Sequence, residues 1–358
     1  MEDLLKKVSS RIKIGNTYVG EGAPVFFIAE IGNNHNGDYH LAKRTIEEAV
    51  KAGANAVKLQ KRSVQDVFAR EMLNKPQTKD EVLGKTYGEY RKSLELSKEE
   101  FLKLKGYSEA FGVPFFATPF DPKSVDFLED VGVDMYKIAS FDVTNTPLLE
   151  YVSRKGKPIF LSSGMVTIEE LDNAVKTILQ YNNQLIINHC VTAYPTPDDK
   201  LNLATIPFLK KRYRPIPIGY SGHEGDILPS IAAVSMGAKT VERHITIDKR
   251  LPGPDHGTVS IEPDEFRKMV ESARRIESAW GIPRKGYLPE EEQVRNKHGK
   301  SLVSRIPIKA GTPITADMLT FKSPGYGIKP YDLQKVLGKT LKKDIEEDSV
   351  ITDDHVMW

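Results

Sequence analysis

Short runs of β-branched and aromatic residues alternate with longer amphipathic stretches eight times between Val25 and Trp280, and this repeat constrains the fold more than any other sequence feature. Such an alternation is typical of repeated βα units that build a parallel sheet. Eight successive parallel strands favour a closed α/β barrel, the (β/α)8 or TIM barrel, over an open doubly wound sheet. The expected strands are Val25–Ile31, Ala56–Gln60, Pro114–Pro119, Met135–Ser140, Pro158–Ser163, Leu185–Val191, Ile216–Ser221 and Thr240–Thr246.

The chain is longer than such a barrel requires. Its 358 residues exceed the roughly 250 of a typical barrel, so a second, smaller domain is expected. We assign residues 1–283 to the barrel, including a hairpin over Arg11–Gly22 that covers the barrel bottom. Residues 284–300 are interpreted as an exposed linker and residues 301–358 as a compact domain of short strands and turns. Lys61–Leu96 forms a polar insertion after the second strand, and an insertion there lies on the catalytic face.

Charge and composition exclude several classes of protein. The net charge of +2, from 51 bases and 49 acids, argues against nucleic acid as the main partner. No apolar run approaches the roughly 20 residues of a membrane span, and Met1–Lys7 lacks the apolar core of a secretory signal. Cys190 is the single cysteine, which excludes an intrachain disulfide and agrees with a cytoplasmic location; we interpret it as a core thiol. The basic run Leu209–Arg214 is interpreted as a solvated helix end.

Polar residues stand at or just beyond the ends of nearly all the expected strands. In this fold the C-terminal strand ends carry the reactive groups. The residues in question are Glu30, Lys58, Gln60, Thr118, Lys137, Ser140, Ser162, Thr192, Tyr194, Ser221, His223, Glu242 and His244.

Lys58 and Lys137 lie within otherwise apolar strands, where an unpaired ammonium group would be costly. Two inward-facing lysines therefore indicate an anionic ligand. The alternative is that each lysine pairs with a structural carboxylate such as Glu30 or Glu242. Serine hydroxyls at neighbouring strand ends would complete a phosphate site, namely those of Ser140, Ser162 and Ser221.

His223 and His244 end adjacent strands and form a plausible metal pair. Neutral imidazole binds Mn, Fe, Co or Zn, and two protein ligands leave positions for water and substrate oxygens. The alternative is two histidines that are merely hydrogen-bonded near a cleft. Glu242 precedes His244 by two residues, so both side chains point to the same face of the strand. Asp255, in a proline-stiffened loop, taken alone is a turn former.

Taken together, these motifs resemble the sialic acid synthase family, and residues 301–358 resemble the antifreeze-like (SAF, β-clip) domain that these synthases carry. The resemblance spans almost the entire chain. It is carried by Ala29–Gly37, Val57–Gln60, Ala117–Phe120, Tyr136–Ser140, Leu161–Met165, Tyr194–Thr196, Gly219–His223, Val241–His244 and Pro252–Asp255.

The resemblance implies a transferase that condenses phosphoenolpyruvate (PEP) with N-acetylmannosamine to give N-acetylneuraminate. The metal polarises the sugar aldehyde, C3 of PEP attacks it, water adds at C2, and phosphate leaves with C–O cleavage. The metal is expected to be Mn, with Mg or Co as alternatives, bound by His223 and His244. The implied PEP ligands are Lys58, Lys137, Ser140, Ser162 and Ser221. The implied catalytic residues facing the sugar are Glu30, Tyr194, Glu242 and Asp255, with Gln60, Thr118, Thr192 and Lys322 as further substrate contacts.

The sequence departs from the family in the SAF domain. Members that act on free N-acetylmannosamine commonly have an arginine that reaches the partner subunit's site, whereas this chain has Ser323, preceded by Lys322. Lysine lacks the planar fork of arginine, so the identity of the sugar substrate stays undecided at this point. A domain-swapped homodimer is still the expected assembly.

Other functions remain as alternatives. Within the enzyme class these are synthases of legionaminic acid, of the deaminated sugar Kdn, or of a 9-phosphate product from a 6-phosphorylated sugar. A 6-phosphate would need extra cations, for which the insertion offers Lys61, Arg62 and Arg70. From a different class, the chain could be a carbohydrate-binding or ice-binding protein with the barrel as scaffold. The lysines, serines and histidines at the strand ends argue against this alternative.

Overall fold

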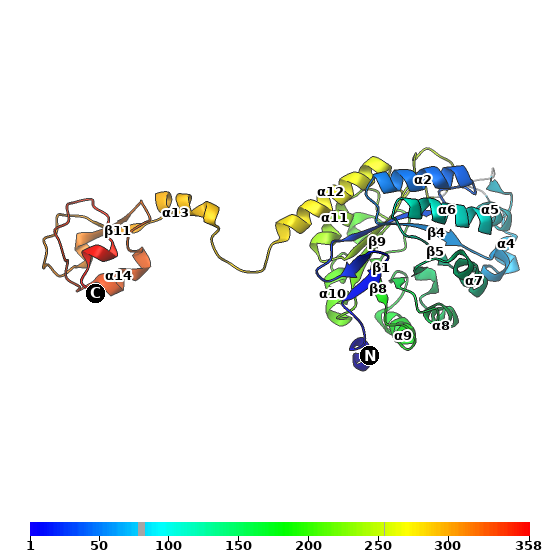
Figure 1. Cartoon of the computed structure of the whole chain (residues 1–358), viewed down its shortest axis with the longest axis horizontal. Coiled ribbons are helices and arrows are strands. Elements are labelled where there is room, and N and C mark those ends of the chain that lie inside the picture. The colour runs from blue at the N-terminus through cyan, green and yellow to red at the C-terminus, as the bar shows by residue number, and fades with distance from the viewer. Residues whose placement is uncertain (78–82, 254) are drawn as a thin grey trace. The chain divides into compact units, whose positions relative to one another are not determined.

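The computed structural model describes residues 1–77, 83–253 and 255–358, which form two compact units, Met1–Gly281 and Ile282–Trp358. The first unit is a closed barrel of eight parallel strands in the order β10-β3-β4-β5-β6-β7-β8-β9 (Figure 1). This confirms the predicted (β/α)8 barrel. The strands are β3 (Phe26–Gly32), β4 (Ala56–Lys61), β5 (Phe115–Pro119), β6 (Tyr136–Ile138), β7 (Ile159–Ser162), β8 (Leu185–Cys190), β9 (Ile218–Gly222) and β10 (Thr240–His244).

The strand ends differ from the predicted ones by one or two residues. The difference matters at Ser140, which was predicted to end a strand and instead begins the 3-10 helix η2 (Ser140–Asp142). The chain turns there because Asp142 N–H donates to Ala139 C=O at 3.0 Å, so η2 follows only one residue after β6. Ser140 is thereby set just beyond the end of the strand.

A helix follows each strand and packs on the outside of the barrel. Several begin at a side-chain cap: Asp38 accepts the His40 and Leu41 N–H groups of α2, and Ser97 and Thr167 form capping boxes on α6 and α9. No helix in the described ranges is both long and apolar enough to cross a membrane. The helices that follow the strands are α2 (Tyr39–Lys51), α6 (Lys98–Ala110), α7 (Pro122–Val131), α8 (Thr146–Ser153), α9 (Ile168–Leu179), α10 (Thr205–Arg212), α11 (Leu228–Ser235) and α12 (Pro263–Trp280).

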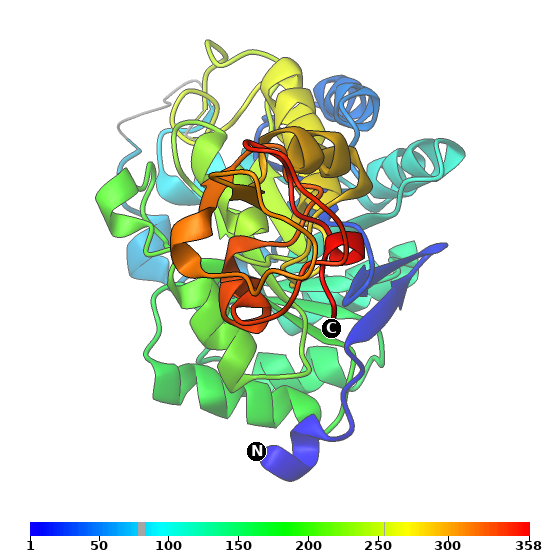
Figure 2. The same cartoon turned by 90° about the vertical axis from the view of Figure 1, so that its left-hand side faces the viewer.

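The N-terminal segment forms the expected hairpin (Figure 2, dark blue). It follows the short helix α1 (Glu2–Leu5) and pairs β1 (Arg11–Ile14) antiparallel to β2 (Thr17–Gly20). Its tip, Gly15, faces Pro114, which immediately precedes β5. The hairpin therefore lies at the N-terminal ends of the strands, where Ile12, Ile14 and Val19 are buried in the barrel's core cluster.

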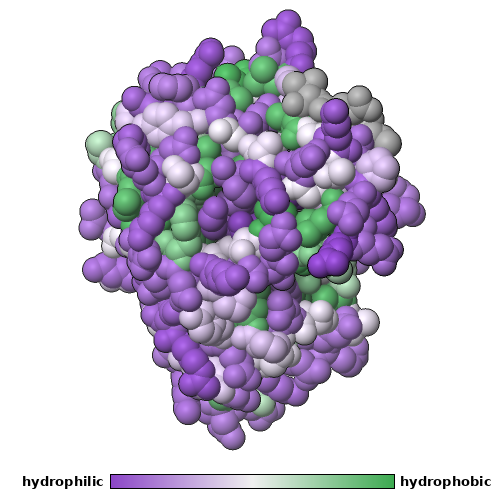
Figure 3. Space-filling view, turned by 90° about the vertical axis from the view of Figure 1, so that its right-hand side faces the viewer, coloured by the Kyte–Doolittle hydropathy of each residue, from purple (hydrophilic) through white to green (hydrophobic). Residues whose placement is uncertain are grey.

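The insertion after β4 carries three short helices, α3 (Val64–Val67), α4 (Arg70–Leu73) and α5 (Tyr87–Ser93). Phe68, Tyr87 and Tyr90 pack edge to face or tilted against one another, and the Arg91 guanidinium lies 5.0–5.8 Å from their rings. Figure 3 views the molecule from the side of α4 and α5, where hydrophilic residues dominate the surface.

The second unit has its own core around Leu302, Ile314, Leu341 and Ile351. Its strands β11 (Ser301–Ser304) and β12 (Leu319–Lys322) pair antiparallel, and α14 (Leu333–Val336) packs beside them. Residues 284–300, expected as a linker, hold η4 (Pro289–Glu291) and α13 (Glu292–His298), and residues 281–298 are exposed throughout.

Candidate active site

A cavity opens at the C-terminal ends of the barrel strands and gathers most of the predicted site residues. Its free volume is about 60 Å³, room for roughly two waters but less than PEP and a sugar need. Substrate entry therefore requires rim side chains to move, and Phe141 and Tyr194 are the exposed aromatic residues of the rim. The predicted residues in the lining are Glu30, Lys58, Gln60, Thr118, Lys137, Ser140, Ser162, Tyr194, Ser221, His223, Glu242 and His244.

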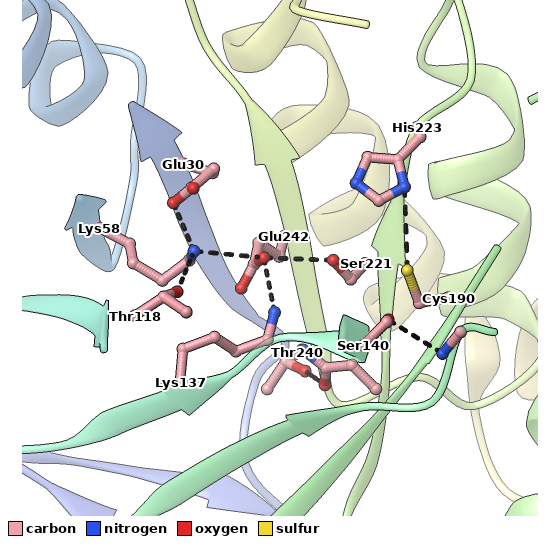
Figure 4. A network of polar contacts seen from close by, with 12 residues as sticks. Glu30, Lys58, Thr118, Lys137, Ser140, Cys190, Ser221, His223, Thr240 and Glu242 are labelled. Carbon is pink, nitrogen blue, oxygen red and sulfur yellow. Dashed lines mark hydrogen bonds and ion pairs between the residues drawn. The ribbon is translucent and has the colours of Figure 1, made fainter. Parts of the chain in front are cut away.

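Two lysines and two glutamates form a buried charge network at the bottom of this cavity (Figure 4). Lys137 Nζ lies 2.7 Å from Glu242 Oε1. Lys58 Nζ lies 2.5 Å from Glu30 Oε2, 3.7 Å from Glu242 Oε1 and 3.0 Å from Thr118 Oγ1. The structure thus realises the alternative considered for the lysines, because each has a carboxylate partner. The pairing does not use every donor: three N–H groups point from each ammonium, and Lys137 donates to Glu242 alone among the described residues.

The two carboxylates have opposite electrostatic surroundings. Burial raises the pKa of Glu30 above its ordinary value, and Lys58 only partly offsets this. Burial also acts to raise the pKa of Glu242, but attraction to Lys137 and Lys58 outweighs it and lowers that pKa. The network therefore separates the two groups: the lysines favour the ionised form of Glu242, while burial favours the protonated form of Glu30.

Glu30 is oriented by a chain of hydrogen bonds that begins at Arg62, in the insertion after β4. Gln60 Nε2 donates to Glu30 Oε1 at 2.7 Å, and the Arg62 guanidinium donates to Gln60 Oε1. Arg62 stacks over the Phe120 ring at 3.9 Å and is 8% exposed. Burial lowers its pKa to about 10, so it stays charged at neutral pH. The cavity wall thus has a cation that forms no ion pair with a carboxylate within the described residues.

Serines and a glycine shape the side of the cavity next to Lys137. Ser221 Oγ donates to Glu242 Oε1 at 3.2 Å, and Ser140 Oγ accepts the Gly164 N–H at 3.0 Å. A Cβ at Gly164 would lie 2.2 Å from Thr192 Oγ1 and 2.8 Å from Ser140 Oγ, so only glycine fits there. The Ser140 hydroxyl also contacts the buried Cys190 thiol, whose pKa it helps to lower.

The two histidines are close enough to share a ligand. Their ring centroids are 5.6 Å apart, and the Tyr194 ring lies 4.3 Å from that of His223. His223 Nδ1 is 2.9 Å from Val191 C=O, which places the proton on Nδ1 and a lone pair on Nε2. Burial lowers the pKa of His244 to about 3, so its ring is neutral at pH 7. His244 Nδ1 is buried without a hydrogen-bond partner in the described part of the chain.

This donor set fits a metal that takes only part of its coordination from the protein. Among the described residues, no group of three or more His, Cys, Asp and Glu side chains is placed to hold an ion. A metal bound here would have the two imidazoles as protein ligands and complete its shell with water and substrate oxygens.

An ion pair behind the histidines links the two chain segments that carry them. Arg243 Nη1 lies 2.8 Å from Glu224 Oε1, and both side chains are fully buried. Arg243 Nη2 also donates to the backbone C=O of Glu224 at 2.7 Å, directly after His223. Tyr220 and Ser230 donate to the same carboxylate. This network was not recognised in the sequence; an arginine between the inward-facing Glu242 and His244 was the signal for it.

Three of the predicted residues do not line the cavity. Asp255 accepts a hydrogen bond from Asn33 Nδ2 at 3.3 Å, beside the cavity, and Pro254 of its motif lies outside the described residues. Thr192 lines a neighbouring pocket instead. Lys322 belongs to the second unit, where it forms an ion pair with Asp348.

Other lining residues were not assigned to the site from the sequence. They are Phe120, Phe141 and Cys190, whose thiol is buried and lies 3.8 Å from His223 Nδ1. The two phenylalanines could have been found from their position, since each directly follows a strand-end motif.

Comparisons with known proteins agree with this geometry. Residues 45–285 match the NeuB family, and residues 299–357 match the SAF domain. The chain belongs to the NeuB family. NeuB-family synthases are enzymes that condense PEP with sugars, and the matches confirm the family and the C-terminal SAF domain inferred from the motifs.

Individual NeuB relatives bear different names. N-acetylneuraminate-9-phosphate synthase from Mus musculus is 40% identical over 95% of this chain and 94% of its own length. N,N'-diacetyllegionaminic acid synthase from Legionella pneumophila is 33% identical over 94% of this chain and 96% of its own. A crystal structure of N-acetylneuraminic acid synthetase from Leptospira borgpetersenii superposes with a TM-score of 0.72 at 36% identity, covering 80% of this chain and 95% of that one. The family is therefore shown, whereas the sugar differs among relatives.

Proposed function

We propose that this protein condenses PEP with N-acetylmannosamine to form the nonulosonic acid N-acetylneuraminate. The observation that carries the proposal is the buried network of Lys58, Lys137, Glu30 and Glu242 beside the imidazoles of His223 and His244, at the strand ends of a NeuB-family barrel. A binding protein would gain nothing from this arrangement, because burying four charges costs free energy.

The PEP end of the site is assigned to Lys137 and the nearby serines. Lys137 has ammonium protons beyond the one given to Glu242, and Ser140 and Ser162 line the same wall. These donors would hold the phosphate and carboxylate of PEP by charge-assisted hydrogen bonds. Glu242 holds both lysines in place through its ion pairs with them. Positioning and charge neutralisation, without a covalent intermediate, then account for the catalysis.

His223 and His244 would hold a divalent ion, for which we propose Mn²⁺. When bound, the ion would supply Lewis-acid polarisation of the sugar's aldehyde oxygen. Val191 C=O fixes the His223 tautomer, and Tyr194 packs against its ring. Gln60 and Thr118 line the same cavity, where they would contact the sugar.

Glu30 is suited to move protons in the reaction. C3 of PEP forms the new C–C bond to the aldehyde carbon, and protonated Glu30 gives its proton to the aldehyde oxygen. Glu30, now a carboxylate, accepts a proton from the water that adds at C2, which restores it. The C2 hydroxyl then passes its proton to the phosphate as the C–O bond breaks. The raised pKa of Glu30, caused by its burial, supports the role as proton donor.

The experiment is an assay of phosphate release. Purified protein with PEP and Mn²⁺ receives N-acetylmannosamine, its 6-phosphate, mannose or 2,4-diacetamido-2,4,6-trideoxymannose in separate reactions. We expect metal-dependent release with N-acetylmannosamine and none with His223→Ala. No release with any sugar would overturn the proposal and favour a carbohydrate-binding protein.

A specific observation favours a second candidate, the 6-phosphorylated sugar. Arg62 is a charged wall residue with no carboxylate partner among the residues the structure describes, whereas Lys61 is 2.6 Å from Glu95 and Arg70 is exposed. The similarity to the Mus musculus 9-phosphate synthase points the same way. If Arg62 binds the sugar phosphate, Arg62→Gln raises the KM of the 6-phosphate at least about tenfold and leaves that of the free sugar unchanged. Lys61→Gln serves as the control.

We further propose that the enzyme is cytoplasmic and acts as a domain-swapped homodimer in which each SAF domain covers the partner's barrel. The single cysteine suits a reducing compartment. The dimer is tested by mixing inactive His244→Ala protein with a full chain lacking SAF-domain function, such as Lys322→Ala. Recovery of activity in the mixture supports the swap. If each variant is inactive alone and the mixture is inactive too, the swap is contradicted.

A further inference from the structure

A second cavity, of about 650 Å³, lies at the end of the barrel opposite the candidate active site. Its wall comes from the segment preceding β9, from Lys239 just before β10, from α10, and from Glu21 just after β2. The candidate active site is at the C-terminal ends of the same two strands. The two cavities share no lining residue, so a ligand in one leaves the other free.

Four cations surround this cavity, and we refer to Lys210, Lys211, Arg214 and Lys239 as the basic rim. Within the described ranges none of the four forms an ion pair. Their neighbour Arg212, on the same helix, does form one, with Asp172. The basic run at the end of α10 is therefore divided: one cation is neutralised, and three face the cavity together with Lys239 from another segment.

Nearby acids do not neutralise the basic rim. Glu21 is the acidic residue of the lining and forms no ion pair in the described part of the chain. Glu277, which attracts Lys239, accepts the Val25 N–H and lies 2.6 Å from Arg274. Four positive charges thus face one free carboxylate.

The position of Lys239 in the basic rim costs free energy. Its side chain is half-buried, and burial, together with repulsion from Lys210, lowers its pKa. Gly237 lets Lys210 approach Lys239. Its Cα carries no side chain, and Lys210 Nζ lies 3.2 Å from where a Cβ would stand. Cations held together in a recess are unfavourable unless an anion joins them.

The remaining wall is apolar and rigid. Pro207, Pro215 and Pro217 line it, with the buried Ile216 and Ile218 beneath. Such a surface suits a flat, weakly hydrated group, while the basic rim suits oxygen anions. The volume falls within the roughly 300–1,000 Å³ of small-molecule sites.

We propose that this cavity binds a small phosphorylated metabolite of nucleotide size, with its phosphate on the basic rim and its ring against the prolines. Arg214 provides a planar fork for a phosphate, and the lysines provide point charges. The site is separate from the PEP site and does not depend on the proposed reaction.

The test is calorimetric titration of the full-length protein with AMP, pyrophosphate and adenosine, each with PEP in excess to fill the catalytic pocket. AMP is expected to bind saturably, with an affinity that falls as salt rises. Adenosine lacks the phosphate and pyrophosphate lacks the ring, so both are expected to bind more weakly. The variant Lys211→Gln/Lys239→Gln is expected to lose at least about tenfold in AMP affinity.

Arg212→Gln is the control: it removes one positive charge from α10 outside the cavity, and it is matched in charge to the single variant Lys211→Gln, which is measured beside it. Thermal unfolding checks the fold of the double variant, which relieves repulsion and should not be less stable. If that variant unfolds, the single exposed change Lys211→Gln replaces it. Absence of AMP binding would overturn the proposal. An equal loss of AMP affinity in Arg212→Gln and in the cavity variant would also overturn it, because it would indicate non-specific electrostatic attraction.

Discussion

Arg243 Nη1 lies 2.8 Å from Glu224 Oε1, and neither side chain is exposed to solvent. The pair joins β10, next to His244, to the segment directly after β9, next to His223. The Arg243 guanidinium also donates to the backbone C=O groups of Glu224 and Asp226. Arg243 therefore fixes the position of the segment that carries His223 relative to the strand that carries His244.

Removing one member of this pair is expected to destabilise the barrel. Arg243→Met leaves Glu224 buried without its main partner, which costs about 3–5 kcal/mol. Urea unfolding followed by circular dichroism measures the loss. The double variant Arg243→Met/Glu224→Leu should recover part of it, because it buries no lone charge. Near-wild-type stability of the single variants Arg243→Met and Glu224→Leu would contradict the role assigned to the pair.

Lys137→Met is expected to impair PEP use. It removes the ammonium group assigned to the substrate anion, and the loss of one such donor typically costs about 10²–10³ in rate. Steady-state kinetics with varied PEP measure the change. The protein should still fold, because Glu242 remains 3.7 Å from Lys58. Lys157→Met is the control: its ion pair with Glu129 lies at the other end of the barrel, and its kinetics should match the wild type.

Metal removal is expected to abolish activity. After EDTA treatment and desalting, Mn²⁺ should restore phosphate release, with Mg²⁺ and Co²⁺ as the comparison ions. His244→Ala removes one of the two proposed protein ligands, so calorimetry should show Mn²⁺ affinity reduced by at least about a hundredfold. His40→Asn changes an exposed histidine and should bind Mn²⁺ like the wild type. Full activity in EDTA would disprove metal dependence.

Acid is expected to destabilise the barrel partly through His35. Burial lowers the pKa of His35 to about 4, against about 6.5 in the unfolded chain. Below pH 6.5 the unfolded state binds the proton first, so stability falls as pH drops from about 6.5 to 4, by up to roughly 3 kcal/mol.

His35→Asn tests this prediction. His35 Nδ1 accepts the Gly37 N–H at 3.0 Å, and an asparagine oxygen can take the same bond without titrating. Urea unfolding at pH 7 and pH 4.5 gives the comparison. The variant should lose less stability on acidification than the wild type, whatever its stability at pH 7. Equal losses would show that His35 does not carry the effect.

Much of the barrel was predictable from the sequence because its signals are local. The alternation of short apolar runs with longer amphipathic stretches identified the strands and the helices between them. Polar residues at strand ends, such as Lys58, Lys137 and His223, were located because parallel strands all end on the same face. The family motifs added their expected chemistry.

The partners of these residues were not predictable in the same way. Lys137 and Glu242 are 105 residues apart, and only barrel closure brings them to 2.7 Å. The place of Arg62 in the wall depends on the fold of the insertion, and the basic rim combines α10 with Lys239.

The sequence by itself therefore determined which strands form and which polar side chains end them, because periodicity and spacing act over a few residues. Only the tertiary structure decided which charges neutralise one another and which, like Arg62 and Lys239, form no ion pair within the described ranges. The physical reason is that Coulomb energies and desolvation depend on distance and burial in space, and these are set by long-range packing.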